Sequence, residues 1–296
     1  MREKKIARYF YSPLCPESFA TLERLKNLFQ SNKNFSFDFF NTADDKFPPD
    51  YPWFPEEKKV ISTLKGKTGQ PLFFGKLMID GEAIKGFPPS PQSLQKVFNK
   101  HNLSWNPALY PFNYQAINRP KWLCKKEGFF LQSYKDNLSL DICRICTKHH
   151  PYLEEKSYRK KEWLRHEKQK FLFLQEKLKE DKLIGIIAYY QQKPVGFVEA
   201  FQLGISSKLG FPVSALNKNG LMITCLSVRT EVKGYGLATH LLQRLVTEAK
   251  KDNYQTLEVI SFPDKHNWQP ASLYKRRGFK EIKKLDQFTL LKKSLL

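Results

Sequence analysis

Residues Leu221 to Phe279 read LMITCLSVRTEVKGYGLATHLLQRLVTEAKKDNYQTLEVISFPDKHNWQPASLYKRRGF. The first part, Leu221 to Val228, is apolar and partly β-branched, which predicts a buried strand. Beyond Lys233 to Ala238, apolar residues recur at helical spacing, namely Leu241, Leu242, Leu245, Val246 and Ala249. A loop with two glycines therefore joins a strand to a helix.

The loop itself, KGYGLA from Lys233 to Ala238, has the features of an anion site. Gly234 and Gly236 lack the Cβ atoms that would keep a ligand away from the backbone, and the helix that follows begins with unbonded N–H groups and a positive dipole end. We expect it to bind a pyrophosphate. A dinucleotide fingerprint needs a third glycine where Thr239 stands, and a triphosphate loop needs a G-K-[ST] sequence that is missing, so neither class is favoured.

The pattern Lys233-x-x-Gly236-x-Ala238 resembles the Q/R-x-x-G-x-G/A acyl-CoA signature of the GCN5-related N-acetyltransferase family, with Lys in place of Gln or Arg. Further residues match that family's N-x-x-x-A-x-L-Y-x-x-x-G-F pattern, namely Asn267, Ala271, Leu273, Tyr274, Gly278 and Phe279. A predicted strand, Thr256 to Phe262, separates the two motifs. The resemblance implies an α/β (α+β) domain with a mixed sheet flanked by helices, and an acetyl-CoA-dependent N-acetyltransferase.

The resemblance also implies roles for single residues. The cofactor-binding residues would be Leu226, Ser227, Val228, Lys233, Gly234, Tyr235, Gly236, Leu237, Ala238, Thr239 and Asn267. Backbone N–H groups from Gly234 to Thr239 would hold the pyrophosphate, and the strand edge at Leu226 to Val228 would bond the pantetheine arm. Tyr274 matches the general acid that protonates the departing thiolate.

The general base does not come from the strand before the loop, because MITCLSV contains no acid. Glu199 on the preceding strand is the nearest candidate, and Asp264 and His266 are the alternatives. We expect direct transfer of the acetyl group to a primary amine of a small molecule or peptide, without a covalent enzyme intermediate.

The first hundred residues predict a separate α/β unit with the order βαβ, helix, ββ, helix. The predicted strands are Lys5 to Tyr11, Phe35 to Phe40, Pro71 to Phe74 and Lys76 to Ile79, and the main helices cover Phe19 to Phe29 and Gln92 to Phe98. With Cys15-Pro16-Glu17-Ser18 after the first strand and Gln70-Pro71 before the third, this unit resembles the thioredoxin-like fold. Ser18 replaces the second cysteine of its redox motif. Two readings stay open: thiol exchange by Cys15, or a docking domain beside a degenerate acyl-CoA-binding domain.

We therefore predict three parts: a thioredoxin-like domain over 1–100, a linker over 101–128 that is rich in Asn, Pro and aromatic residues, and the acyltransferase-like domain over 129–296. In the last part we expect a first strand over Leu138 to Ile145 and a charged helix over Leu153 to Glu180. A hairpin should follow, with strands Leu183 to Tyr190 and Val195 to Phe201.

The composition indicates what the chain binds. Lys and Arg number 50 against 29 Asp and Glu, so a net charge of +21 should attract polyanions such as nucleic acid, anionic membrane or the phosphates of coenzyme A. The charges are scattered along the chain, which favours a solvated surface over a nucleic-acid site. No segment is long enough to span a membrane, and the first residues lack a signal peptide, so we expect a cytoplasmic protein.

The five cysteines are spread along the chain and do not resemble a disulfide framework. Cys143-x-x-Cys146, followed by His149 and His150, has zinc-like spacing. Because no second ligand cluster exists and adjacent histidines rarely serve one compact site, we expect a strand cysteine at Cys143 and no metal.

Overall fold

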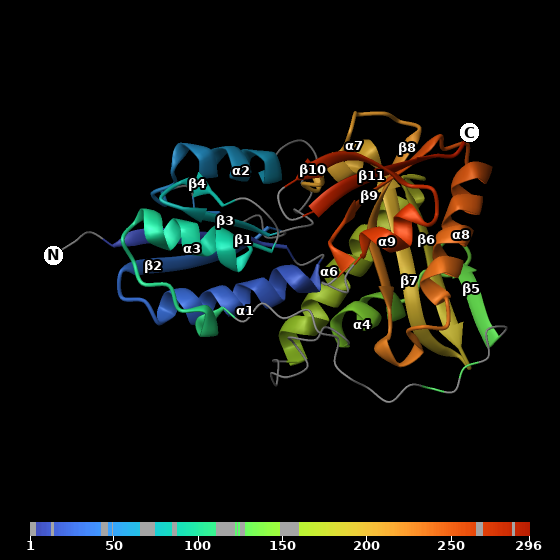
Figure 1. Cartoon of the computed structure of the whole chain (residues 1–296), viewed down its shortest axis with the longest axis horizontal. Coiled ribbons are helices and arrows are strands. Elements are labelled where there is room, and N and C mark those ends of the chain that lie inside the picture. The colour runs from blue at the N-terminus through green and yellow to red at the C-terminus, as the bar shows by residue number, and fades with distance from the viewer. Residues whose placement is uncertain are drawn as a thin grey trace. The chain divides into compact units, whose positions relative to one another are not determined.

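The computed structural model describes residues 4–12, 15–42, 47–48, 50–65, 75–84, 88–110, 122, 124, 128–148, 160–264, 269–285 and 288–296. The chain divides into two compact units (Figure 1). One comprises residues 1–113 with 208–210, and the other comprises 114–207 with 211–296. The main division falls within the segment 101–128 for which we predict a linker.

The N-terminal unit contains a four-stranded sheet in the order β2-β1-β3-β4. Its elements are β1 (Lys5–Tyr11), α1 (Pro16–Gln30), β2 (Phe35–Asn41), α2 (Pro55–Lys65), β3 (Lys76–Ile79), β4 (Glu82–Ala83), α3 (Pro91–Lys100) and the short η1 (Pro107–Leu109). Strand β1 runs parallel to β2 and antiparallel to β3, and β3 pairs with β4 across the turn at Asp80 and Gly81. The expected strand 71–74 and Gln70-Pro71 lie outside the described residues. The thioredoxin-like character of this unit stays a prediction.

A buried ion pair ties α2 to the sheet of this unit. Arg8 on β1 and Glu57 on α2 are both buried and bond to each other. The guanidinium of Arg8 also lies 4.7 Å from the ring centroid of Tyr51 and 5.4 Å from that of Trp53. A buried charge needs a partner, so Arg8 and Glu57 stay paired. This pair and the ring contacts of Arg8 hold the segment from Tyr51 to Glu57 against β1.

The C-terminal unit contains a seven-stranded sheet in the order β10-β11-β9-β8-β7-β6-β5. Its elements are β5 (Phe129–Ser133), α4 (Asp141–Lys148), α6 (Lys160–Lys179), β6 (Leu183–Tyr190), β7 (Lys193–Gln202), α7 (Leu203–Lys208), β8 (Gly220–Val228), η3 (Thr230–Val232), α8 (Leu237–Lys251), β9 (Thr256–Ser261), α9 (Ala271–Lys275), β10 (Lys280–Leu285) and β11 (Phe288–Ser294). Strands β8 and β9 are parallel, and the other neighbours pair antiparallel. The predicted mixed sheet flanked by helices is confirmed.

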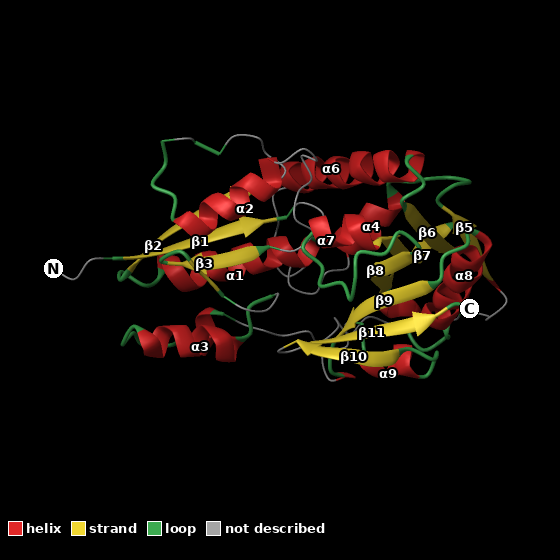
Figure 2. Cartoon of the chain, turned by 90° about the horizontal axis from the view of Figure 1, so that it is seen from above, coloured by secondary structure: helices red, strands yellow, loops and turns green. Residues whose placement is uncertain are grey.

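Helices cover both faces of this sheet. Helix α8 packs on β6, β7 and β8, while α4 packs on β7 and β8 and α6 packs on β6. Figures 1 and 2 show α8 on one face and α4 with α6 on the other. The face under α8 holds a core cluster that includes Val198, Leu226, Leu241, Leu245 and Tyr274.

The strand predicted over Leu138 to Ile145 is wrong, because these residues lead into helix α4. The segment alternates apolar and polar residues, which mimics a strand, but Ile142 and Ile145 are three residues apart and are both buried on one side of the helix. Ser139 Oγ accepts a hydrogen bond from the Asp141 N–H (3.1 Å) at the start of α4. The first strand of the unit is β5, and the predicted charged helix begins at Lys160 in the described residues.

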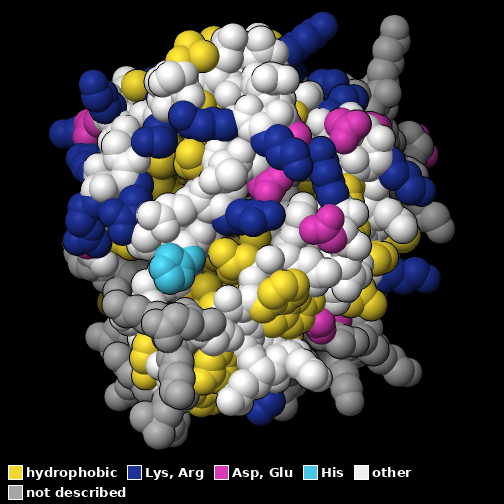
Figure 3. Space-filling model, turned by 90° about the vertical axis from the view of Figure 1, so that its right-hand side faces the viewer, with side chains coloured by type: hydrophobic (Ala, Val, Ile, Leu, Met, Phe, Trp, Pro, Cys, Tyr) yellow, Lys and Arg dark blue, Asp and Glu magenta, His cyan; other side chains and the backbone are white. Residues whose placement is uncertain are grey.

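Charged side chains are dispersed over one face of the molecule. On the face in Figure 3, Lys and Arg side chains are spread over the surface with Asp and Glu between them. None of the helices in the described ranges combines the length and the apolar character that a bilayer-spanning helix requires.

Candidate functional site

Strands β8 and β9 separate in the middle of the sheet. They pair only where Gly220 to Ile223 face Thr256 to Val259. The pairing of β7 with β8 shifts at the same point, since Glu199 faces Cys225 whereas Ala200 faces Ile223, which leaves Thr224 as an extra residue. Such a bulge bends the strand that carries it. The β8 edge from residue 224 to 228 therefore faces no paired strand within the described part of the chain.

This open section of β8 includes the three strand residues predicted to contact the cofactor, Leu226, Ser227 and Val228. Their other edge pairs with β7, where Val198 faces Leu226. An extended ligand that carries amide groups can add to such an edge as a strand does. The structure therefore supplies a backbone edge at the predicted place.

The glycine loop leads from η3 into α8 in a left-handed conformation. Gly234 has φ 96° and Gly236, the N-cap of α8, has φ 81°. Residues with a Cβ rarely adopt these angles, so both positions require glycine. A Cβ built on Gly236 would meet no atom within 4 Å. The space over the loop is open, which is the room that a bound phosphate group requires.

The backbone N–H groups of this loop are available to an anion. The N–H groups of Thr239 and His240 donate to the Gly236 carbonyl (2.9 and 3.1 Å) and close the first turn of α8. Those of residues 234–238 donate no hydrogen bond to any group that the structure describes. The predicted pyrophosphate site thus has five open donors, and the Thr239 N–H is already bonded. Leu237 is buried, so it contributes only its backbone.

Two cations border the loop. Lys233 is half-buried, and burial lowers the pKa of its ammonium group. A nearby anion opposes that shift because it favours the charged form. Arg277, in the turn after α9, donates from Nη2 to Thr239 Oγ1 (3.2 Å). Sequence reasoning missed Arg277, although it follows Tyr274 by three residues.

The Tyr235 side chain anchors the loop to the domain. Its hydroxyl donates to the Trp122 carbonyl (2.7 Å), and the guanidinium of Arg229 lies 4.7 Å from the Trp122 ring centroid. Tyr235, predicted to bind the cofactor, therefore uses its side chain to fix the conformation of the loop.

The predicted acid, Tyr274, is fully buried on α9. Its hydroxyl donates to Gln269 Oε1 (3.0 Å). Burial raises the pKa of Tyr274 well above its ordinary value, and the Cys225 thiol on the open section of β8 adds to the rise. The phenol therefore keeps its proton near neutral pH, as a general acid must. Sequence reasoning missed Gln269, whose backbone has a left-handed φ of 43° that its residue type does not predict.

The three candidate bases have different surroundings. Glu199 on β7 is fully buried, and its Oε1 accepts from the Tyr134 hydroxyl (3.2 Å) and pairs with Lys170 Nζ (3.3 Å). Asp264 is exposed, and its hydrogen bond from the Ser272 N–H (3.0 Å) lowers the pKa of the Asp264 carboxyl, which weakens it as a base. His266, like Asn267, lies outside the described residues.

The N-terminal cysteine lies at the predicted place but is buried. Cys15 is the N-cap of α1, with 6% of its surface exposed. Ser18 Oγ, which stands where a second thiol would be, accepts from the Ser12 N–H (2.8 Å) and lies 3.1 Å from the Tyr9 hydroxyl. Because reactive cysteines are usually partly exposed, this burial gives no support to thiol exchange.

The zinc-like sequence is only partly described. Cys143 is buried on helix α4 rather than on the predicted strand, and the Cys146 side chain, His149 and His150 lie outside the described residues. Within the described ranges, no group of three or more His, Cys, Asp or Glu side chains is arranged to hold a metal.

Comparison with known proteins concerns the C-terminal half of the chain. Residues 142–279 match the acetyltransferase (GNAT) family. A search of the curated proteins finds no match. Among solved structures, the PaiA N-acetyltransferase of Thermoplasma acidophilum in complex with coenzyme A is 14% identical in sequence, with a TM-score of 0.40, and the match covers 56% of this chain and 99% of that one.

Two further solved structures have similar scores. An N-acetyltransferase of Staphylococcus aureus Mu50 is 18% identical, with a TM-score of 0.38 and coverage of 57% of this chain and 99% of its own. Aminoglycoside 6'-acetyltransferase type Ii is 17% identical, with a TM-score of 0.39 and coverage of 56% and 97%.

Proposed function

Because residues 142–279 form an acetyltransferase domain of the GNAT family, whose donor is acetyl-CoA, we propose that the chain transfers an acetyl group to a primary amine of a small molecule or peptide. The observation that carries this proposal is the arrangement of three features along the second half of β8 and the loop that follows it. These are the unpaired edge of β8, the glycine loop at the start of α8, and the buried phenol of Tyr274 beside Cys225.

Acetyl-CoA supplies the acetyl group as a thioester. Described residues could bind two of its parts, the pyrophosphate and the amide-bearing arm. The open N–H groups of residues 234–238 would hold the pyrophosphate, with positive charge from Lys233 and Arg277. The edge of β8 at residues 226–228 would bond the amide-bearing arm. Asn267 remains a predicted contact.

The chain's own residues would move the protons. Glu199 would accept a proton from the ammonium of the acceptor, which frees the nitrogen lone pair to form the new N–C bond. Tyr274 would donate its phenolic proton to sulfur as the C–S bond breaks. The nitrogen then loses a second proton, which restores the Tyr274 phenol, and Glu199 releases its proton to solvent. The products are an amide, free coenzyme A and one proton.

Calorimetric titration with acetyl-CoA tests whether the chain binds the donor. A panel of amines tests whether it transfers the acetyl group to an acceptor. The panel contains a polyamine, an aromatic amine and a tripeptide with a free N-terminus. Product mass and release of the coenzyme A thiol report transfer. We expect micromolar binding and transfer to at least one member. Absence of acetyl-CoA binding would contradict the proposal.

Glu199→Gln tests the base. The amide keeps the size of the side chain but cannot take a proton from the acceptor, so we expect kcat/KM for the amine to fall by about 100-fold. The affinity for acetyl-CoA, measured by calorimetry, should stay unchanged because Glu199 lies on β7, away from the loop. Asp264→Asn is the comparison variant. Loss of activity in Asp264→Asn and not in Glu199→Gln would assign the base to Asp264.

A further inference from the structure

Three residues form a row across neighbouring strands on the face of the sheet that α4 and α6 cover. Gly185 on β6 faces Glu199 on β7, and Glu199 faces Cys225 on β8. Side chains that face each other directly across antiparallel strands lie on the same side of the sheet. Glu199 therefore lies between Gly185, which has no side chain, and Cys225, which belongs to the open section of β8.

Tyr134 fills the space that Gly185 leaves. The Tyr134 N–H donates to the Gly185 carbonyl (2.9 Å), and a Cβ built on Gly185 would lie 2.1 Å from a ring carbon of Tyr134. Only glycine at 185 leaves room for this ring. From that position the Tyr134 hydroxyl reaches across to Glu199 Oε1. The pKa of Tyr134 is raised well above its ordinary value, mainly by burial and secondly by the nearby Glu199. Its hydroxyl therefore remains a neutral donor.

Lys170 approaches the same oxygen from helix α6. Its ammonium lies 3.3 Å from Glu199 Oε1 and 5.1 Å from the ring centroid of Phe197, and both Lys170 and Glu199 are buried. A buried carboxylate is charged only where a partner compensates it. Lys170 provides that partner on Oε1.

The second oxygen of the same carboxylate is in a different situation. Glu199 Oε2 is buried and has no hydrogen-bond partner among the described residues. An unmet acceptor in the interior is unfavourable, so a donor that reached Oε2 would be stabilised there. Both donors instead converge on Oε1, and the open section of β8 lies one strand away.

We propose that Tyr134, Lys170 and Gly185 are positioning residues that hold the Glu199 carboxylate by Oε1 and leave Oε2 to accept a proton from a cationic amine acceptor. This inference rests on the proposed acetyl transfer and adds to it the residues that position the base. The Glu199–Lys170 pair is neutral in sum, so an incoming ammonium meets an oxygen acceptor without a net positive charge opposing it. Among the described residues, the other titratable groups that act on Tyr134, beside this carboxylate, are Cys143 of α4 and Cys225 of β8.

The test is the pH dependence of kcat/KM for transfer to the best amine of the panel, in Tyr134→Phe, Lys170→Met and Gly185→Ala. Removal of the hydroxyl or the ammonium makes the carboxylate easier to protonate, so the acid limb of the profile should move to higher pH by about one unit or more in Lys170→Met, and less in Tyr134→Phe. Gly185→Ala keeps every polar group but displaces the Tyr134 ring, so it should reproduce Tyr134→Phe. Lys170→Arg should restore the wild-type limb.

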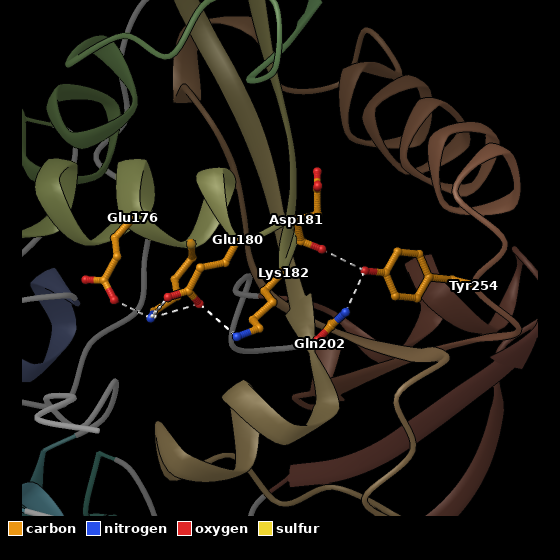
Figure 4. A network of polar contacts seen from close by, with 7 residues as sticks. Glu176, Glu180, Asp181, Lys182, Gln202 and Tyr254 are labelled. Carbon is orange, nitrogen blue, oxygen red and sulfur yellow. Dashed lines mark hydrogen bonds and ion pairs between the residues drawn. The ribbon is translucent and has the colours of Figure 1, made fainter. Parts of the chain in front are cut away.

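Matched controls come from a polar network elsewhere in the same unit (Figure 4). Lys177, also buried on α6, pairs with Glu176 (2.5 Å) and Glu180 (3.3 Å). The Tyr254 hydroxyl bonds Gln202 (3.1 Å) and the Asp181 carbonyl (3.2 Å). Lys177→Met and Tyr254→Phe therefore remove equivalent groups without touching Glu199, and the acid limb should not move in either.

Titration of glutamate carboxyl carbons by NMR, with Glu199→Gln to assign the signal, gives a readout that does not need turnover. Thermal unfolding and acetyl-CoA titration establish that each variant is folded. If the acid limb of the kcat/KM profile and the midpoint of the Glu199 NMR titration move to higher pH together, the inference is supported. The inference would be overturned if the Glu199 titration moved while the acid limb of the kcat/KM profile did not, or if kcat/KM fell equally at every pH. Tyr134, Lys170 and Gly185 would then have a structural role only. Wild-type protein that binds acetyl-CoA but acetylates no amine would overturn the proposed function as well.

Discussion

Gly236→Glu should weaken acetyl-CoA binding by more than about 100-fold, since opposing like charges costs several kcal/mol. Gly236 caps α8 with φ 81°, and its Cβ position opens into the space over the loop. A glutamate there would put a carboxylate beside the N–H groups proposed to hold phosphate. It would also strain the left-handed backbone that those groups need. Calorimetric titration with acetyl-CoA measures the effect.

The control for this substitution is Gly210→Glu. Gly210 is also exposed and also left-handed, with φ 91°, but it lies outside the glycine loop. The same strain and charge are therefore added without touching the proposed site, and acetyl-CoA affinity should match that of the wild type. Thermal unfolding shows whether either variant is destabilised. A Gly236→Glu protein that is folded and still binds acetyl-CoA at wild-type affinity would place the cofactor elsewhere.

Tyr274→Phe should lower kcat by about 100-fold or more and leave the affinity for acetyl-CoA unchanged, because the lost phenol acts only as sulfur departs. The acid form exists below the pKa of Tyr274, and that pKa is raised, mainly by burial. Deprotonation of Tyr274 should therefore cause no alkaline loss of wild-type activity up to about pH 10, the ordinary tyrosine value.

The substitution also affects stability, so activity alone is not enough. Removal of the hydroxyl leaves Gln269 Oε1 without its donor, which should cost about 1–3 kcal/mol of folding free energy. Tyr254→Phe removes a hydroxyl with two partners of its own and should leave kcat unchanged. Steady-state kinetics at a temperature where both variants are folded separate the two effects. A kcat within a few fold of wild type in Tyr274→Phe would remove this residue from the mechanism.

The glycine loop and its helix were predictable because their signals are local. Gly234 and Gly236 both take left-handed φ angles, and of the apolar residues that predicted α8, four are buried in the core and Val246 is partly buried against it. The alternation in Leu138 to Ile145 was misleading because a short helix with one buried side can carry the same apolar pattern.

The surroundings of Glu199 could not be predicted, because they are assembled from distant parts of the chain. Tyr134 and Lys170 reach one carboxylate only when β5, α6 and β7 are in place, and neither belongs to a motif. The bulge at Thr224, which coincides with the end of the pairing between β8 and β9, depends on strand register rather than on residue type. Pairing of this kind is decided by tertiary packing.

The close fit of the Tyr134 ring over Gly185 means that these two positions do not vary independently. A side chain at 185 is excluded as long as an aromatic ring lies there, and would be tolerated beside a small residue at 134. The cost of changing either therefore depends on the other, and their combined effect should depart from the sum of the single effects. Among natural variants of this domain, the two positions should change as a pair, and a lineage that loses the ring would lose the constraint on the glycine with it.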